Sequence, residues 1–206
     1  QSSMRLNVRP LSEWGIGARA AQAMFGLMFY VQKTVWPTRL SPIYEMPRVF
    51  EALEPRFVAA YLFAAAMLVM AIACRRRFPA LTAVAAVYAI VLSPVLGVFQ
   101  SGPQLVADRY AYIASIPWAV LIGAGAAWLW QGPRRRWLAL AAPALVALSA
   151  QTWRQTGYWR NSEALFKHAI DVGADGPVAR EFYGRQLIER GDKVGALAQF
   201  DRGVEL

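Results

Sequence analysis

The chain has little that can ligate a metal ion or form a disulfide. Its 206 residues include one cysteine, Cys74, and one histidine, His168, far apart in the sequence. A single cysteine excludes an intramolecular disulfide, and one distant Cys and His pair assembles neither a zinc site nor a Cys–His nucleophile. There is also no glycine-rich loop of the kind that cradles nucleotide phosphates. We therefore expect no metal and no cofactor.

Charge is also scarce over long stretches. Hydrophobic residues make up 57% of the chain and charged residues 17%. Each uncharged run approaches or reaches the ~20 residues that a helix needs to cross about 30 Å of hydrocarbon, except the last, which is shorter. The pattern predicts an integral membrane protein. The predicted spans in these runs are 57–74, 79–99, 110–130 and 137–153.

The positive charge is concentrated rather than spread over a surface. The net charge of +9 lies in the amino-terminal region and in two arginine triplets, 75–77 and 134–136. Basic residues in short loops mark the cytoplasmic side, and the two spans between the triplets return the chain to that side. The charge therefore indicates topology and not a nucleic-acid surface. We expect no nucleic-acid partner.

The first apolar segment, 14–35, has two interpretations. Five of its residues, among them the three that interrupt the apolar run, fall on one helical stripe, which on a spanning helix should face protein or a wet cavity. Taken as a span, the segment gives five crossings in all. Taken as an amphipathic helix, it lies on the membrane surface. The stripe consists of Arg19, Gln22, Gly26, Tyr30 and Lys33.

The tail, 154–206, changes character because it is charged and has no further apolar run. It predicts helices over 162–172, 178–190 and 193–206. Its small and aromatic residues keep the spacing of the tetratricopeptide repeat, although an ordinary helical hairpin is the alternative. Such repeats need about three units, so we expect a truncated array within a longer polypeptide. The residues with this spacing are Gly184, Ala196, Phe200 and Gly203, and, one repeat earlier, Phe166 and Ala169.

The predicted fold is therefore all-α: a polytopic bundle of about five transmembrane helices over 1–153, followed by an extracytoplasmic repeat array. One short outer loop, 100–112, carries an acid and a base, Asp108 and Arg109, at the mouth of a predicted span. On physical grounds alone, Asp108 favours the helix amino-terminus and Arg109 reaches lipid headgroups.

Three segments resemble, in order, those of membrane O-mannosyltransferases that join a GT-C transmembrane domain to tetratricopeptide repeats. Residues 106–115 resemble the family signature Val-Ala-Glu-Arg-x-x-Tyr-x-Pro-Ser, with Asp108 in place of Glu and Ala114 in place of Pro. An earlier segment and the passage into the tail also match. Their matching residues are Lys33, Pro37, Leu40, Ser41, Pro42, Tyr44, Trp159, Ser162, Leu165 and Phe166.

The resemblance implies a glycosyltransferase in a bacterial inner membrane or an ER-like membrane. It would transfer a sugar, by resemblance mannose, from a polyprenyl-phosphate donor to a protein or peptide acceptor on the extracytoplasmic face. The family's catalytic acids belong to an amino-terminal half, so the resemblance implies no catalytic residue in this chain. It implies that Arg109, with Lys33, holds the donor phosphate. Asp108 would orient Arg109 or a neighbouring group, and Tyr110 and Tyr112 would line the lipid-facing mouth.

A non-catalytic function also fits the pattern. A membrane-anchored repeat scaffold, which holds a partner protein on its helices, explains both the apolar runs and the tail without any chemistry.

Overall fold

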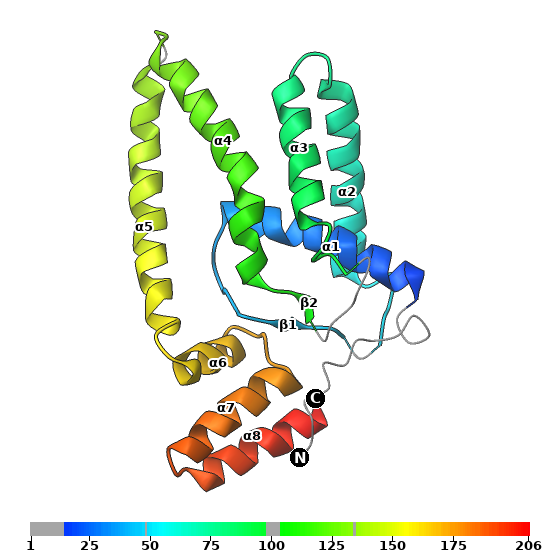
Figure 1. The fold of residues 1–206 in the computed structure, drawn as a ribbon, viewed down its shortest axis with the longest axis vertical. Coiled ribbons are helices and arrows are strands. Elements are labelled where there is room, and N and C mark those ends of the chain that lie inside the picture. The colour runs from blue at the N-terminus through cyan, green and yellow to red at the C-terminus, as the bar shows by residue number, and fades with distance from the viewer. Residues whose placement is uncertain (1–14, 48, 98–103, 134) are drawn as a thin grey trace. The chain divides into compact units, whose positions relative to one another are not determined.

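The protein is described by a computed structural model over residues 15–47, 49–97, 104–133 and 135–206. This part of the chain contains eight α-helices and two short strands (Figure 1). The prediction of an all-α fold is confirmed. The chain divides into two compact units, one formed by 1–36 with 46–134 and the other by 37–45 with 135–206.

The first unit contains four α-helices. One short strand and one 3₁₀ turn lie between the third and the fourth of them. In chain order the elements are α1 (Ile16–Val35), α2 (Pro55–Cys74), α3 (Pro79–Leu92), β2 (Gln104–Val106), η1 (Asp108–Tyr110) and α4 (Ala111–Trp130).

The second unit contains the remaining elements. In chain order these are β1 (Tyr44–Glu45), η2 (Arg135–Leu140), α5 (Ala141–Tyr158), α6 (Ser162–Asp171), α7 (Pro177–Glu189) and α8 (Lys193–Glu205).

Two helical segments in the described residues are long and apolar enough to cross a membrane. They are α2, with 20 residues, and η1 continued by α4, with 23 residues. Both expose most of their apolar side chains, which a water-soluble core helix would not do. Two of the five predicted spans therefore meet this criterion, and α1, α3 and α5 do not.

The predicted span 79–99 is shorter in the structure. Helix α3 has 14 residues and ends at Leu92. Pro94 follows two residues later and cannot donate a backbone hydrogen bond, and Gly97 adopts a left-handed φ of 76°. These two residues turn the chain out of the helix. The last two predicted positions, 98 and 99, lie outside the described residues.

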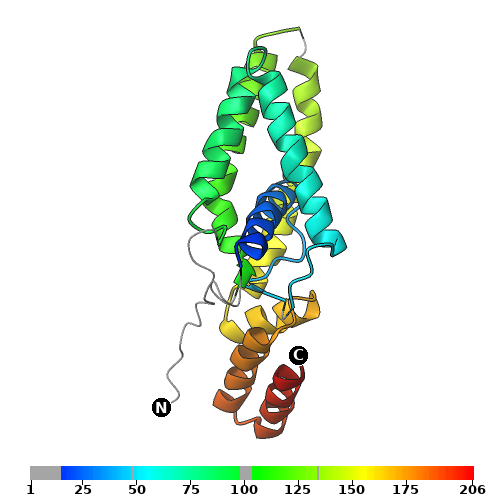
Figure 2. The same cartoon turned by 90° about the vertical axis from the view of Figure 1, so that its right-hand side faces the viewer.

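Helices α2 and α3 form an antiparallel hairpin (Figures 1 and 2). The turn between them carries Arg75, Arg76 and Arg77. Across it, the Thr82 hydroxyl donates to the Ala71 carbonyl at 3.1 Å. The arginine turn therefore lies at one end of the hairpin.

Helix α1 runs across the opposite end of the hairpin, below α2 and α3, and crosses the lower part of α4 (Figure 1). A core at this crossing joins α1 to the first turn of α2 and to β2. The predicted polar stripe does face protein, because Arg19, Gln22, Gly26 and Tyr30 are all buried. The core residues are Ala18, Ala21, Met46, Phe57 and Leu105, with Phe25, Phe50 and Tyr61 packed against them.

The predicted apolar run 137–153 is divided between two elements. Its first residues lie in η2, and α5 then continues past Trp153 to Tyr158. The predicted boundary between membrane domain and tail at 153 therefore falls inside α5. Within this unit, the Gln151 side chain donates to the Pro37 carbonyl at 3.2 Å, which ties the segment 37–45 to α5.

The three tail helices lie within one residue of the predicted bounds, and local signals explain why. The Asn161 side chain accepts from the Ala164 amide at 2.8 Å, and Asp192 accepts from Gly195 at 2.9 Å, so both act as amino-terminal caps. Glycines at positive φ follow the carboxyl ends of two helices: Gly173 follows α6 and Gly191 follows α7.

The residues that predicted a repeat are contact residues of the tail. Phe166 stacks on Phe182 with ring centroids 4.7 Å apart. Gly184 of α7 lies against the Phe200 ring of α8, so close that an added Cβ would stand 2.6 Å from it. Ala169 and Ala196 are fully buried or nearly so. The small residues are therefore where the helices approach each other.

Candidate functional site

The predicted site loop is held by side chains of α1. Gln22 Nε2 donates to the carbonyl of Leu105 at 3.2 Å, and the Ala107 amide donates to the Tyr30 hydroxyl at 3.3 Å. Leu105, Val106 and Ala107 are buried. Because its backbone is bonded and its side chains are covered, the segment that leads into η1 is fixed in place.

Tyrosine contacts also fix α1 to the helices beyond it. The Tyr88 hydroxyl of α3 donates to the Leu27 carbonyl at 2.7 Å. The Tyr88 ring in turn meets Trp118 of α4 edge to face, with centroids 5.6 Å apart. Four elements, α1, α3, β2 and α4, therefore position the site loop.

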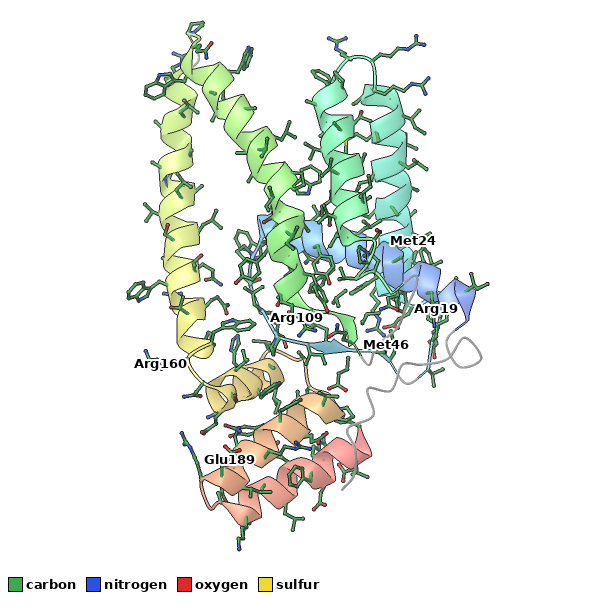
Figure 3. The ribbon with its side chains drawn as sticks, in the orientation of Figure 1. Arg19, Met24, Met46, Arg109, Arg160 and Glu189 are labelled. Atoms are coloured by element: carbon green, nitrogen blue, oxygen red, sulfur yellow. The ribbon has the colours of Figure 1, made fainter. Side chains whose placement is uncertain are left out.

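The 3₁₀ turn η1 separates the acid from the base. Successive residues of such a turn point about 120° apart. Asp108 is only 7% exposed, whereas Arg109 lies on the surface at the start of α4, as Figure 3 shows. The acid is thus part of the packed base of the loop, and the guanidinium is presented to the surroundings.

Arg109, Gln104 and Tyr110 form a polar cluster, which we call the Arg109 cluster. Arg109 Nη2 donates to Gln104 Oε1 at 3.0 Å and to the Tyr110 hydroxyl at 3.1 Å. Gln104 Nε2 closes the triangle by donating to the same hydroxyl at 2.9 Å. The guanidinium also lies over the Tyr110 ring, 4.9 Å from its centroid, in a cation–π contact.

The cluster leaves much of the guanidinium available for binding. A guanidinium has five N–H donors, and both bonds of Arg109 leave from Nη2. Nε and Nη1 have no hydrogen-bond partner in the described part of the chain. An exposed, permanently charged group that is fixed on one side and open on the other can bind an anion without first losing its own freedom.

These contacts bear on one part of the predicted role of Asp108, the orienting of Arg109; the orienting of a neighbouring group stays a prediction. The hydrogen bonds that orient Arg109 go to Gln104 and Tyr110, not to Asp108. The physical reason is the turn itself, which directs the carboxylate inward and the guanidinium outward. Tyr110, which was predicted to line the site, also holds Arg109 through its hydroxyl.

The other predicted residues lie on neighbouring elements. Lys33 is in the last turn of α1, its ammonium 5.3 Å from the Phe29 ring centroid. Tyr30, one turn earlier, contacts Ala107, and α1 packs against η1. Lys33 therefore comes from the helix that supports the Arg109 loop. Tyr112 is 77% exposed in the first turn of α4 and takes no part in the Arg109 cluster.

Three residues of the site had no predicted role there. Gln22 and Tyr30 belong to the polar stripe of α1, so the pattern showed that they face protein but not what they hold. Gln104 carried no signal, since a lone glutamine in a loop is ordinary. Its importance comes from the fold, which places it against Arg109.

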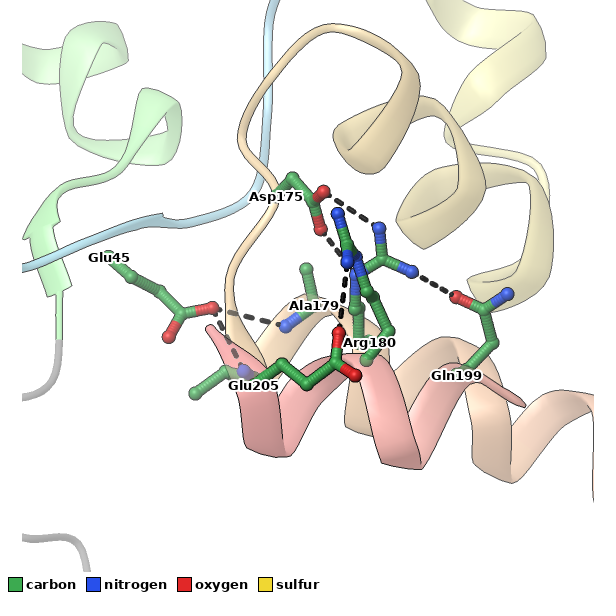
Figure 4. Close-up of polar contacts among 8 residues, drawn as sticks. Glu45, Asp175, Ala179, Arg180, Gln199 and Glu205 are labelled. Carbon is green, nitrogen blue, oxygen red and sulfur yellow. Dashed lines mark hydrogen bonds and ion pairs between the residues drawn. The ribbon is translucent and has the colours of Figure 1, made fainter. Parts of the chain in front are cut away.

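A second polar arrangement lies in the other unit. Glu45 Oε1 accepts from the amides of Val178 at 2.9 Å and Ala179 at 3.2 Å, at the amino-terminus of α7 (Figure 4). Burial raises the pKa of the Glu45 carboxyl, the two amide bonds lower it, and nearby Asp175 raises it. These contacts let the segment 37–45 cap a tail helix that is remote in the sequence.

Arg180 adds a second set of bonds at this end of α7. It makes two 2.7 Å bonds to Asp175 and one to Gln199 of α8 (Figure 4). The loop before α7, α7 itself and α8 are thus joined by one side chain. No group of three or more His, Cys, Asp or Glu residues that could hold a metal occurs in the described residues.

Comparison with known proteins finds no matching protein family, curated protein or solved structure.

Proposed function

We propose that this chain forms the donor-binding end of an integral membrane glycosyltransferase that uses a polyprenyl-phosphate-linked sugar. Arg109 binds the lipid phosphate, and Lys33 adds positive charge from the adjoining helix. The observation that carries the proposal is the Arg109 cluster: a guanidinium fixed through Nη2, with Nε and Nη1 open, at the mouth of a helix long enough to span a membrane.

The chemistry of the reaction suits an arginine at this position. When the bond between the sugar and the lipid phosphate breaks, the phosphate leaves with additional negative charge. Hydrogen bonds from a guanidinium strengthen as that charge develops, so they stabilise the transition state more than the bound donor. Because Gln104 and Tyr110 hold the group beforehand, little reorganisation is needed during the reaction.

The resemblance to O-mannosyltransferases adds the sugar and the acceptor to the proposal. The sugar is mannose, and the acceptor is a protein or peptide on the extracytoplasmic face. The tail helices would form the repeat array that faces this side. The contact of Gly184 with Phe200 and the burial of Ala169 and Ala196 support that part, because these are positions where a repeat presses its helices together.

The proposal is tested by sugar transfer in membranes from cells that make the protein at its natural length. With polyprenyl-phosphate mannose as donor, we expect Arg109→Ala to lower transfer severely and Arg109→Lys to retain part of it, because an ammonium lacks the planar fork. Gln104→Ala should fall in between. Asp108→Asn should be milder than Arg109→Ala, since neither proton transfer nor phosphate binding is assigned to Asp108.

The matched control is Arg76→Ala, an exposed arginine of the same unit at the far end of the α2–α3 hairpin. It should transfer sugar at the parental rate. Parental transfer by Arg109→Ala would refute the role of this arginine and leave it a headgroup anchor.

A membrane-anchored scaffold is the second candidate function. The observation that favours it is a set of three exposed apolar side chains on one face of α8, around the exposed Asp201: Val194 is 83%, Leu197 61% and Val204 80% exposed. Such a face fits a further helix of a partner protein. Under this alternative, Leu197→Asp weakens a partner complex, and Arg109→Ala changes neither that complex nor any transfer reaction.

A further inference from the structure

We propose that α1 does not cross the membrane but lies in its plane at the extracytoplasmic surface, with one face in the acyl chains of that leaflet. The inference rests on one part of the proposed function, namely that α2 and α4 cross a membrane. It concerns a different surface from the Arg109 cluster, and its partner is the lipid bilayer itself.

The direction of α1 is the first observation. Its 20 residues extend about 30 Å, enough to cross the hydrocarbon, but they run across the ends of α2 and α3 and across the lower part of α4 (Figure 1). If α2 and α4 stand in the membrane, a helix that crosses them at their ends lies along the membrane plane. The crossing is fixed by two hydrogen bonds: Tyr88 of α3 bonds to the backbone of α1, and Gln22 of α1 bonds to Leu105 of β2.

The two faces of α1 are the second observation. Its buried face carries the polar stripe, from Arg19 to Lys33. The opposite face is apolar over most of its length, with the exposed Gln32 at its edge near the carboxyl end. It consists of Gly17, Ala20, Met24, Leu27, Met28, Val31 and Val35, of which none is classed as buried.

An apolar face that protein leaves open is unfavourable against water and favourable against acyl chains. The usual amphipathic surface helix turns its polar face to water. Here the site loop takes that place for Gln22 and Tyr30, which bond to it, and the apolar face of α1 remains for lipid.

The third observation is where the apolar face points. A groove of about 490 Å³ lies between α1 and α2, and its α2 side is formed by Tyr61, Ala64, Ala65 and Leu68. These residues progress along α2 away from α1 and toward the arginine turn. Met24, on the α1 side of the groove, lies toward α2 in Figure 3. The apolar face of α1 therefore looks along the length of the predicted span, which is where the hydrocarbon lies.

This arrangement changes the expected topology. The arginine turn at 75–77 is assigned to the cytoplasm, so α1 at the other end lies outside, and both of its ends are on the same side. The chain then crosses one time fewer before α2 than the five-span arrangement requires. It also places the Arg109 loop, which α1 supports, at the level of lipid headgroups, where the phosphate of a lipid-linked sugar is found.

The test is cysteine labelling of the full chain in intact cells with a membrane-impermeant maleimide. All variants carry Cys74→Ser, so that each has one cysteine. Gly15→Cys and Gln32→Cys probe the two ends of α1, since both positions are exposed, and a Cβ at Gly15 meets no atom within 4 Å. Gln131→Cys, exposed at the end of α4, is the cytoplasmic control, and Met24→Cys probes the apolar face.

We expect both Gly15→Cys and Gln32→Cys to be labelled in intact cells, Gln131→Cys only after permeabilisation, and Met24→Cys in neither case. Labelling of one end of α1 and protection of the other would overturn the inference and establish α1 as a span. Labelling of Met24→Cys equal to that of Gly15→Cys would overturn it as well, because the apolar face would then meet water.

Two further outcomes bear on the membrane embedding on which the proposed function also depends. If both ends of α1 are protected and Gln131→Cys is labelled, α1 still lies in the plane, but the assignment of the outer face fails. If all positions except Met24 are labelled alike in intact cells, α4 does not cross the membrane, and both the embedding and the inference are refuted.

Discussion

Replacing Gly184 by alanine tests the packing of the tail helices most sharply. A Cβ at this position would lie 2.6 Å from Cε1 and 2.9 Å from Cζ of the Phe200 ring. An ordinary contact begins near 3.4 Å, so the ring must move by about 0.8 Å, the difference between 3.4 and 2.6 Å. Gly203 on α8 is the matched control, because its added Cβ would lie 3.5 Å from the Arg180 Cβ, which is an ordinary contact.

The two substitutions share one energy term and differ in the other. Alanine stabilises a helix interior by roughly 1 kcal/mol relative to glycine, and this gain applies to both positions, less near a helix end. Overpacking costs about 1–3 kcal/mol and applies only at Gly184. We therefore expect Gly184→Ala to be about 1–3 kcal/mol less stable than Gly203→Ala, while Gly203→Ala is neutral or slightly more stable than the parent.

The assay is amide hydrogen exchange of α7 and α8 in the full chain, followed by mass spectrometry. A loss of 1.4 kcal/mol increases the exchange of amides that open locally about tenfold. Phe200→Leu removes the ring edge, so in the double variant the cost of Gly184→Ala should shrink. If Gly184→Ala exchanges no faster than Gly203→Ala, these helices are not in the contact described, and the repeat interpretation loses its structural support.

Other predictions concern polar groups of the second unit. Glu45→Ala should destabilise α7 by about 0.5–2 kcal/mol, measured by the same exchange, because two amides lose their acceptor, whereas Glu45→Gln keeps an acceptor. Since the pKa of Glu45 in the folded state lies above its ordinary value of 4.5, the folded state binds the proton more tightly than the unfolded state. Stability should therefore fall as the pH rises from 4.5 through the folded pKa. Glu45→Gln should abolish this dependence, and a parental slope in that variant contradicts the assignment. Burial lowers the pKa of His168, which stacks on Tyr158 at 3.7 Å, so stability should fall as pH drops below 6.5, and His168→Phe should remove this loss in thermal melts.

The tail could be predicted closely from the sequence because its signals are local. Caps at Asn161 and Asp192 and glycines at 173 and 191 determine where the helices start and stop, and all of these act within a few residues. The span 79–99 was predicted too long because an uncharged run says nothing about where Pro94 and Gly97 end the helix. The boundary at 153 stays a prediction; charge and apolar content change there, while helix α5 continues to Tyr158.

The site was only partly predictable because its geometry is not local. The sequence indicated Arg109 as the exposed base at a helix mouth, and that exposure is confirmed. It did not indicate which groups orient the guanidinium, because Gln104 and Tyr110 meet it only after a strand and a 3₁₀ turn have formed. The stripe on α1 showed that one face is polar, but the direction of the helix depends on Tyr88 and on contacts far away in the sequence.

The binding of a polyprenyl phosphate to the chain in lipid nanodiscs tests the central claim most directly. A photoreactive analogue, titrated against the parent protein and single variants, gives the affinity. A hydrogen bond to a charged group contributes about 1.5–3 kcal/mol, so Arg109→Ala should bind about 10–150-fold more weakly and Arg109→Lys at an intermediate level. Arg76→Ala should bind like the parent. Parental affinity in Arg109→Ala, or an equal loss in Arg76→Ala, would show that the arginine at the helix mouth does not hold the phosphate and would contradict the account.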